Sequence, residues 1–192
     1  MNPKLIKGPW SAGYSLDDHT TSSTFIGYDQ QGHPQFDTTR SELGECLYRL
    51  KNKNDQAQVA TLATQSANFV VDWGIKLDVV IPVPATKHRT LQPTVAVAKA
   101  LADKLDIAFD GESVKRTAKA KELKGVFDPA ERAKLLKGAY RVVGADLAGK
   151  SVLLLDDLYR SGATMAGVAE LVKSAGAADV FALALTRTRI RR

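Results

Sequence analysis

The chain has 192 residues, of which 44% are hydrophobic and 25% are charged, and its formal net charge is +6. This length and composition are typical of a globular domain with a substantial core. No apolar run approaches the roughly 20 residues of a membrane helix, so we expect no membrane-spanning segment. The single cysteine, Cys46, excludes an internal disulfide and a cysteine-rich metal cluster. Because the first residues lack the apolar core of a signal peptide, we expect a cytoplasmic protein.

The first 40 residues are rich in Thr, Ser, Gly and Asp, and they predict an N-terminal arm or hood ahead of a main domain at 41–192. Residues 24–28 and 33–36 flank the sequence Asp29-Gln-Gln-Gly32, a pattern typical of a β-hairpin with a glycine in its turn. Five aromatic residues predict one apolar patch that docks the arm on the main domain: Trp10, Tyr14, Phe25, Tyr28 and Phe36.

Two helices and a strand are predicted next. Ser41 is placed to cap a helix that ends in the polar run 51–55, and a second helix from about 56 to 73 is stopped by Gly74. Residues 77–84 predict a buried strand, with Pro82 at its end, where a missing N–H is tolerated. Pro93 then stands near the start of a helix.

The second half of the chain continues this alternation. Strands are predicted at 113–116, at 140–143, where the chain returns to the sheet, and at 178–185. The segment 115–137 between them carries eight basic and three acidic residues, with one short helix at 129–136. Alternating strands and helices indicate an α/β fold with a mostly parallel sheet flanked by helices.

One stretch carries recognisable chemistry. Residues 152–155 predict a buried strand, Asp156 and Asp157 come where it should end, and the loop 160–164 opens a helix that Gly176 ends. Free N–H groups at a helix start bind phosphate, and the small residues of the loop allow close approach. Carboxylates would repel a phosphate but suit sugar hydroxyls and a hydrated Mg²⁺ ion. The combination predicts a sugar-phosphate site.

A second loop is predicted at the same edge of the sheet. Residues 85–90 follow the strand at 77–84 and include Lys87, His88 and Arg89. Because open parallel sheets bind ligands at the carboxyl ends of their strands, these cations favour a pyrophosphate site over an ordinary basic loop.

The sequence LLLDDLYRSGAT resembles the motif with which type I phosphoribosyltransferases bind 5-phosphoribosyl 1-pyrophosphate (PRPP). The order of strand, basic loop, helix, basic segment and final motif is similar to that of ComF-like phosphoribosyltransferases over residues 41–189. The N-terminal zinc module that these proteins often carry is missing, because the chain has one cysteine.

The resemblance implies transfer of a phosphoribosyl group from PRPP to a nitrogen nucleophile, with Mg²⁺ as cofactor. It implies that Asp156 and Asp157 meet the ribose hydroxyls and a metal-bound water, and that Lys87 assists catalysis. The residues implied for the 5′-phosphate are Arg160, Ser161, Gly162, Ala163 and Thr164. Those implied for pyrophosphate are Ala85, Thr86, Lys87 and Arg89, with Lys119, Lys121 and Lys124 as a lid.

Several alternatives stay open. Tyr159 either forms a wall for the acceptor or packs beneath the loop. A PRPP-sensing regulator without chemistry would keep the same loop. A nucleic-acid-associated protein would use the segment 115–137 and the arginine tail at 187–192, although a solvated tail is favoured. The sequence does not identify the acceptor substrate. By analogy with the family, a homodimer is expected.

Overall fold

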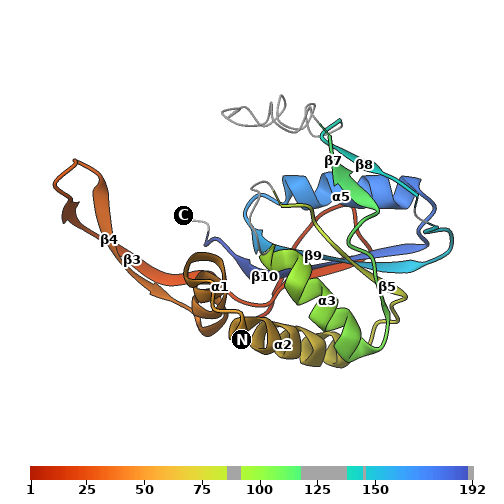
Figure 1. Cartoon of the computed structure of the whole chain (residues 1–192), viewed down its shortest axis with the longest axis horizontal. Coiled ribbons are helices and arrows are strands. Elements are labelled where there is room, and N and C mark those ends of the chain that lie inside the picture. The colour runs from red at the N-terminus through yellow and green to blue at the C-terminus, as the bar shows by residue number, and fades with distance from the viewer. Residues whose placement is uncertain (86–91, 118–137, 145, 190–192) are drawn as a thin grey trace.

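A six-stranded sheet forms the centre of the computed structural model, which describes residues 1–85, 92–117, 138–144 and 146–189 (Figure 1). The outermost strand β1 is antiparallel to β2, and all other neighbouring strands of this sheet are parallel. The predicted α/β fold with a mostly parallel sheet is confirmed. In spatial order the strands are β1 (Lys4–Leu5), β2 (Ala12–Ser15), β10 (Asp179–Arg187), β9 (Ser151–Tyr159), β5 (Val79–Pro82) and β6 (Ala108–Phe109).

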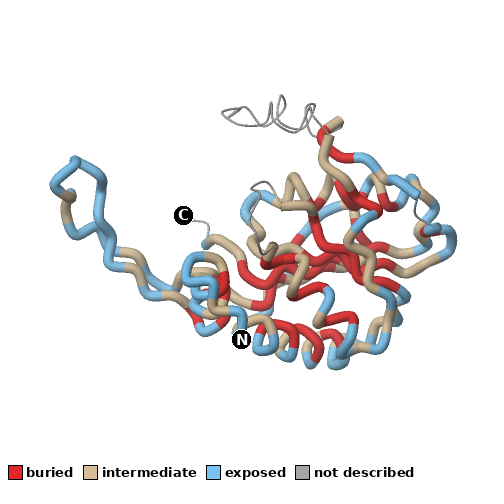
Figure 2. Tube along the Cα trace, viewed as in Figure 1, coloured by how far each residue is buried: buried red, intermediate tan, exposed pale blue. Residues whose placement is uncertain are grey.

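Helices cover both faces of the sheet (Figure 1). Alternate residues of β9 enter different apolar clusters, because successive side chains of a strand point to opposite faces. Among the described residues, Leu153 and Leu155 pack with three helices on one face, whereas Val152 and Leu154 pack with one helix on the other. Figure 2 shows the buried residues concentrated in the sheet between these layers. The first face carries α1 (Glu42–Lys53), α2 (Ala57–Trp73) and α3 (Pro93–Leu105), and the second carries α5 (Ala163–Ser174).

The helix boundaries follow from local sequence. The Ser41 side chain accepts a hydrogen bond from the Gly44 N–H (3.0 Å) and caps α1. The second helix ends at Gly74, which adopts the left-handed conformation that glycine tolerates best. Pro93 is the first residue of α3. Among the described residues, no helix is both long enough and apolar enough to span a bilayer.

The predicted hairpin is confirmed and is longer than expected. Strands β3 (Thr20–Tyr28) and β4 (Pro34–Arg40) pair in antiparallel fashion and project from the main body as an arm (Figures 1 and 2). The prediction of one aromatic docking patch is wrong. Phe25 contacts Tyr28 and Phe36 on the exposed arm, whereas Trp10 lies in the core. The three aromatic residues of the arm lie on a hairpin that projects from the main body, so they contact one another. Aromatic composition alone does not specify which surface such residues pack against.

Residues ahead of the arm join the main sheet. β1 and β2 form its edge beyond β10, so among the first 40 residues only the hairpin of β3 and β4 projects. The boundary at residue 40 stays a prediction. The expectation that residues 140–143 return to the main sheet is wrong, because β8 (Tyr140–Val142) pairs with β7 (Val114–Arg116) in a separate two-stranded sheet. Val114 and Tyr140 bury their side chains in the same cluster as α5. The helix predicted at 129–136 lies outside the described residues.

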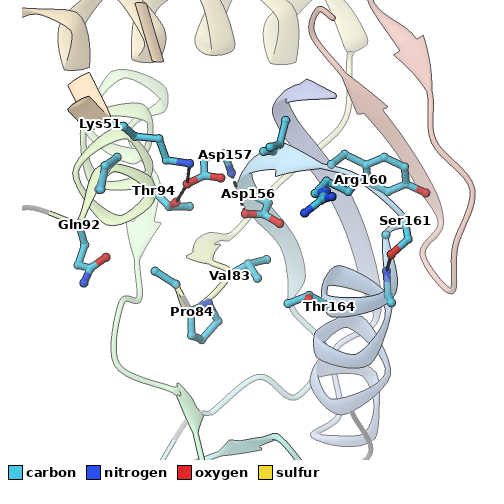
Figure 3. A pocket seen from close by; sticks show the side chains of 16 residues that line it. Lys51, Val83, Pro84, Gln92, Thr94, Asp156, Asp157, Arg160, Ser161 and Thr164 are labelled. Carbon is cyan, nitrogen blue, oxygen red and sulfur yellow. Dashed lines mark hydrogen bonds and ion pairs between the residues drawn. The ribbon is translucent and has the colours of Figure 1, made fainter. Parts of the chain in front are cut away.

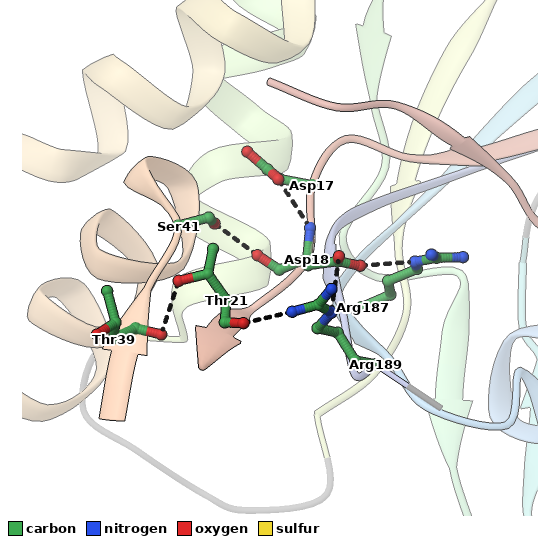
Figure 4. Close-up of polar contacts among 7 residues, drawn as sticks. All are labelled: Asp17, Asp18, Thr21, Thr39, Ser41, Arg187 and Arg189. Carbon is green, nitrogen blue, oxygen red and sulfur yellow. Dashed lines mark hydrogen bonds and ion pairs between the residues drawn. The ribbon is translucent and has the colours of Figure 1, made fainter. Parts of the chain in front are cut away.

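The base of the arm is tied to the end of β10 (Figure 4). The Asp18 carboxylate accepts a hydrogen bond from the Arg187 Nε (2.9 Å) and lies 3.5 Å from the Arg189 Nε. The Ser41 hydroxyl, which caps α1, donates to the Asp18 carbonyl. The prediction of a solvated arginine tail is wrong for Arg187, whose side chain is 31% exposed and pairs with the Asp18 carboxylate. Arg189 reaches the same carboxylate but keeps 58% of its side chain exposed, in agreement with the prediction.

Candidate functional site

A pocket of about 380 Å³ opens at the carboxyl ends of β5 and β9 (Figure 3). This is the edge at which open parallel sheets bind ligands. Both acids and the whole loop of the predicted sugar-phosphate site line the pocket, and so does Ala85 from the second loop. The lining residues are Lys51, Val83, Pro84, Ala85, Gln92, Pro93, Thr94, Asp156, Asp157, Leu158, Tyr159, Arg160, Ser161, Gly162, Ala163 and Thr164.

The two carboxylates lie within β9 and not after it. Pairing with β10 continues as far as Tyr159, so the predicted strand end at residue 155 is wrong. Backbone hydrogen bonds to β10 extend the strand past the apolar run, so that it includes two polar residues that an apolar pattern alone would leave outside the strand. By the alternation of a strand, Asp156 continues the side of Val152 and Leu154, and Asp157 continues the opposite side.

Asp157 accordingly meets the helices of the first face. Its Oδ2 lies 2.6 Å from the Lys51 Nζ of α1 and accepts a hydrogen bond from the Thr94 Oγ1 of α3 at 3.1 Å (Figure 3). These contacts hold the carboxylate in one orientation at the wall of the pocket. Its own backbone N–H donates to the Asp156 Oδ1 (2.8 Å) and so links the two acids.

Asp156 is the electrostatically unusual group of the site. Burial, followed by the negative charge of Asp157, raises the pKa of its carboxyl from 3.8 to about 7. Two neighbouring carboxylates in a shielded pocket favour a proton or a cation between them. A cation would therefore bind most readily between Asp156 and Asp157 when both carboxyl groups are ionised.

The loop at the start of α5 is shaped by Gly162. This residue has φ of +74°, a conformation that disfavours side chains, and a Cβ added there would lie 2.5 Å from the Tyr159 hydroxyl. Tyr159 packs beneath the loop and donates to the Lys7 carbonyl (3.3 Å), which is one of the two roles considered for it. The loop residues 160–164 line the pocket above it.

This loop presents hydrogen-bond donors to an anion. The first N–H groups of any helix lack partners within that helix, and its N-terminus carries partial positive charge. The Ala163 N–H donates a long hydrogen bond to the Ser161 Oγ (N to O, 3.5 Å), and the side chains of Arg160 and Thr164 come from the same end of the pocket (Figure 3). The arrangement can bind a phosphate group at this end and hydroxyls or a cation at the acids.

The second loop is only partly described. Ala85 lines the pocket, and its carbonyl accepts a hydrogen bond from the Arg116 Nη1 (3.4 Å) of β7. The other residues predicted for pyrophosphate lie outside the described residues: Thr86, Lys87 and Arg89. The predicted lid residues lie outside them as well: Lys119, Lys121 and Lys124.

The sequence analysis missed Lys51, Gln92 and Thr94, which line the pocket from α1 and the start of α3. Thr94 follows a loop at the carboxyl end of a strand, and this position could have identified it as a candidate site residue. Lys51 stands in a basic run at the end of a helix, a pattern that is normally solvated. Only the packing of α1 on the sheet brings it to the acids.

The described residues include no group of three or more His, Cys, Asp or Glu side chains that could hold a metal ion. The donor set is therefore the pair of carboxylates. Mg²⁺ typically binds one or two carboxylates and completes its shell with water and phosphate oxygens, and the raised pKa of Asp156 indicates a site that favours added positive charge. The pair fits such an ion.

A family model described as a phosphoribosyl transferase domain matches residues 51–192. The chain belongs to this family. The superfamily resemblance expected from the motif is thereby confirmed, and the match spans the pocket from Lys51 to the loop before α5.

One relative by sequence and two solved structures resemble parts of this chain. Ribose-phosphate pyrophosphokinase of Pyrococcus abyssi is 28% identical over 103 residues, which are 50% of this chain and 36% of that protein. Glutamine PRPP amidotransferase from B. subtilis, solved with ADP and GMP, superposes with a TM-score of 0.53 at 17% identity, over 82% of this chain and 34% of that one. A structure described as the allosteric regulatory enzyme of purine biosynthesis gives 0.51 at 17% identity, over the same shares. The chain thus spans about a third of each protein, and the superpositions show the shared fold.

Proposed function

We propose that this protein is a PRPP-dependent phosphoribosyltransferase that displaces pyrophosphate from C1 of PRPP with a ring nitrogen of a nucleobase-like acceptor. The observation that supports this function is one pocket in which an acid pair adjoins a phosphate-binding loop at a helix start. The family match and the shared fold support the same reaction class.

In this proposal PRPP lies along the edge of the sheet. Its 5′-phosphate binds the loop of Arg160 to Thr164, where N–H groups and hydroxyls converge. Its ribose hydroxyls donate to Asp156 and Asp157, which are acceptor-only when ionised. Its pyrophosphate points to Ala85 in the loop after β5, where Thr86, Lys87 and Arg89 follow in the sequence.

The proposed chemistry is a substitution at C1. The bond from C1 to the acceptor nitrogen forms, the bond from C1 to the pyrophosphate oxygen breaks, and that oxygen keeps the bonding electrons. The acceptor nitrogen then gives its proton to water. Positive charge grows on the ribose in the transition state, next to the carboxylates of Asp156 and Asp157, which stabilise it. Lys87 is proposed to stabilise the negative charge that grows on the departing pyrophosphate.

We assign Mg²⁺ to Asp156 and Asp157, held directly or through water. When bound, the ion would supply positive charge that neutralises the pyrophosphate. The residues Lys119, Lys121 and Lys124 are proposed to close over the bound substrate, since a lid excludes water from such a reaction.

Asp157→Asn tests the assignment. We expect the variant to bind PRPP with Mg²⁺ more weakly and to release pyrophosphate more slowly with every base that the wild type accepts. Calorimetry measures the first effect, and a pyrophosphate-release screen of nucleobases measures the second. Asp37→Asn, on the exposed arm, is the control and should match the wild type. Wild-type binding and turnover in Asp157→Asn would refute the role of this residue.

The match to ribose-phosphate pyrophosphokinase favours a second candidate, in which the same pocket takes a ribose phosphate and receives pyrophosphate from a nucleoside triphosphate. Incubation of the protein with both compounds and detection of PRPP tests it. PRPP binding without release of pyrophosphate for any acceptor would instead support a PRPP-sensing regulator. Binding of nucleic acid that weakens steeply with salt would support the nucleic-acid alternative.

The subfamily, the cellular location and the oligomeric state of the protein are also proposals. The order of motifs supports a ComF-like member of the family, and the composition supports a cytoplasmic location. A homodimer is proposed by analogy with the family, and light scattering at several protein concentrations tests it.

A further inference from the structure

Lys51 turns away from solvent at a helix end where a lysine would normally be hydrated. It lies in the last turn of α1, a position that favours a cation because the helix dipole is negative there. Lys53, in the same turn, is exposed. The side chain of Lys51 keeps only 23% of its surface exposed and reaches the pocket, where its Nζ contacts Asp157 (2.6 Å; Figure 3).

The contact joins two parts of the fold that are distant in the sequence. Asp157 belongs to the strand that precedes the phosphate loop, whereas α1 belongs to the layer on one face of the sheet. The base of the arm fixes the start of α1 through Ser41. The position of Lys51 is therefore set by elements outside the strand–loop–helix motif.

Asp157 is held at its side chain and at its backbone. Lys51 and Thr94 share the Oδ2 atom, and the Asp157 carbonyl accepts a hydrogen bond from the Thr186 Oγ1 (3.1 Å). Thr186 in turn lies 3.1 Å from the His19 Nδ1. Lys51 and Thr94 both contact this carboxylate, and of these two only Lys51 is charged. Because only 18% of the Asp157 side chain is exposed, water screens the attraction between the two charges little.

The charge of the pocket also depends on Lys51. The charged residues among the described lining are Asp156, Asp157, Lys51 and Arg160, which cancel when both acids are ionised. Without Lys51 these described residues would carry an excess negative charge. This excess would weaken the attraction of the site for a substrate with a phosphate at one end and a pyrophosphate at the other.

We propose that Lys51 is a positioning residue of the site: it orients the Asp157 carboxylate toward the ribose hydroxyls and cancels the negative charge that would repel PRPP. This inference rests on the proposed function. It adds α1, which lies ahead of the strand, loop and helix motif, to the substrate-binding unit.

The test compares Lys51→Met with Lys51→Arg and with the control Lys53→Met, which alters an exposed lysine of the same helix turn. We expect Lys51→Met to raise the Kd for PRPP with Mg²⁺ by about tenfold or more, since losing a charged hydrogen bond has about that effect. Lys51→Arg should restore most of the affinity, and Lys53→Met should match the wild type. With an identified acceptor, the KM for PRPP should rise more than kcat falls.

Calorimetry measures the affinity, and thermal melts show that each variant is folded. An affinity of Lys51→Met equal to that of Lys53→Met overturns the inference alone. A loss of affinity that Lys51→Arg fails to restore, together with a lower melting temperature, assigns a structural role and also overturns it. Absence of PRPP binding by the wild type overturns the proposed function, and the inference with it.

Discussion

Replacing Asp156 by asparagine should stabilise the ligand-free protein at pH 8 and leave its stability nearly unchanged at pH 4. In the unfolded chain this carboxyl loses its proton near its ordinary pKa of 3.8, whereas burial and the charge of Asp157 raise the pKa to about 7 in the fold. Between these values the folded state holds a proton that the unfolded state has lost. Raising the pH through this window therefore destabilises the fold, and the loss is complete above about pH 7.

The size of the effect follows from the two pKa values. Because one pKa unit corresponds to about 1.4 kcal/mol, the difference between 3.8 and about 7 corresponds to roughly 4 kcal/mol as an upper bound. Asparagine has nearly the same shape, carries no charge, and keeps the oxygen that accepts the Asp157 N–H. The Asp156→Asn variant should gain up to that amount at pH 8, while the same change impairs PRPP binding.

Urea denaturation at pH 4, 6 and 8, followed by circular dichroism, measures the free energy of unfolding of both proteins. Asp157→Asn is the matched control, because it removes the partner of Lys51 and should give no comparable gain at pH 8. Equal stability of Asp156→Asn and wild type at pH 8, or an equal gain at pH 4 and pH 8, would refute the reasoning.

Two further predictions concern the loop and the arm. Gly162→Ala should weaken PRPP binding and lower the free energy of unfolding by about 1–3 kcal/mol, because φ is +74° and the new Cβ would lie 2.5 Å from the Tyr159 hydroxyl. In urea denaturation Gly74→Ala, with φ of +69° and open space around it, should lose less, and an equal loss would contradict the packing argument. Asp18→Ala should lower stability by about 1 kcal/mol, because Arg187 loses its partner. Thermal melts should show a smaller difference in high salt, and a difference that salt leaves unchanged would speak against an ionic contact.

Much of the local structure could be predicted because its signals are contiguous. Ser41, Gly74 and Pro93 mark helix ends through caps and fixed backbone angles, and each acts where it was predicted to act. The loop before α5 and the acids that precede it line one pocket for the same reason, since the nine neighbouring residues 156–164 form strand, loop and helix start.

The errors share a different cause. The end of β9 was placed too early because its pairing with β10, and not its apolar run, carries the strand through Asp156 and Asp157. Tyr140 was assigned to the main sheet because a short apolar strand does not specify its neighbour, and it pairs with β7 instead. The aromatic residues of the arm looked like a docking patch, although the hairpin holds them away from the core.

By itself, the sequence determined that an acid pair precedes a small-residue loop at the start of a helix, because both depend on residue types and short-range backbone geometry. Only the tertiary structure decided how the two acids differ. Strand pairing directs Asp157 toward the helices of one face, and the packing of α1 places the Lys51 ammonium 2.6 Å from it. Asp156 receives no such ion pair within the described residues, and burial raises its pKa. The direction of a side chain and the position of a distant helix are set by packing of the whole fold, so no local pattern contains them.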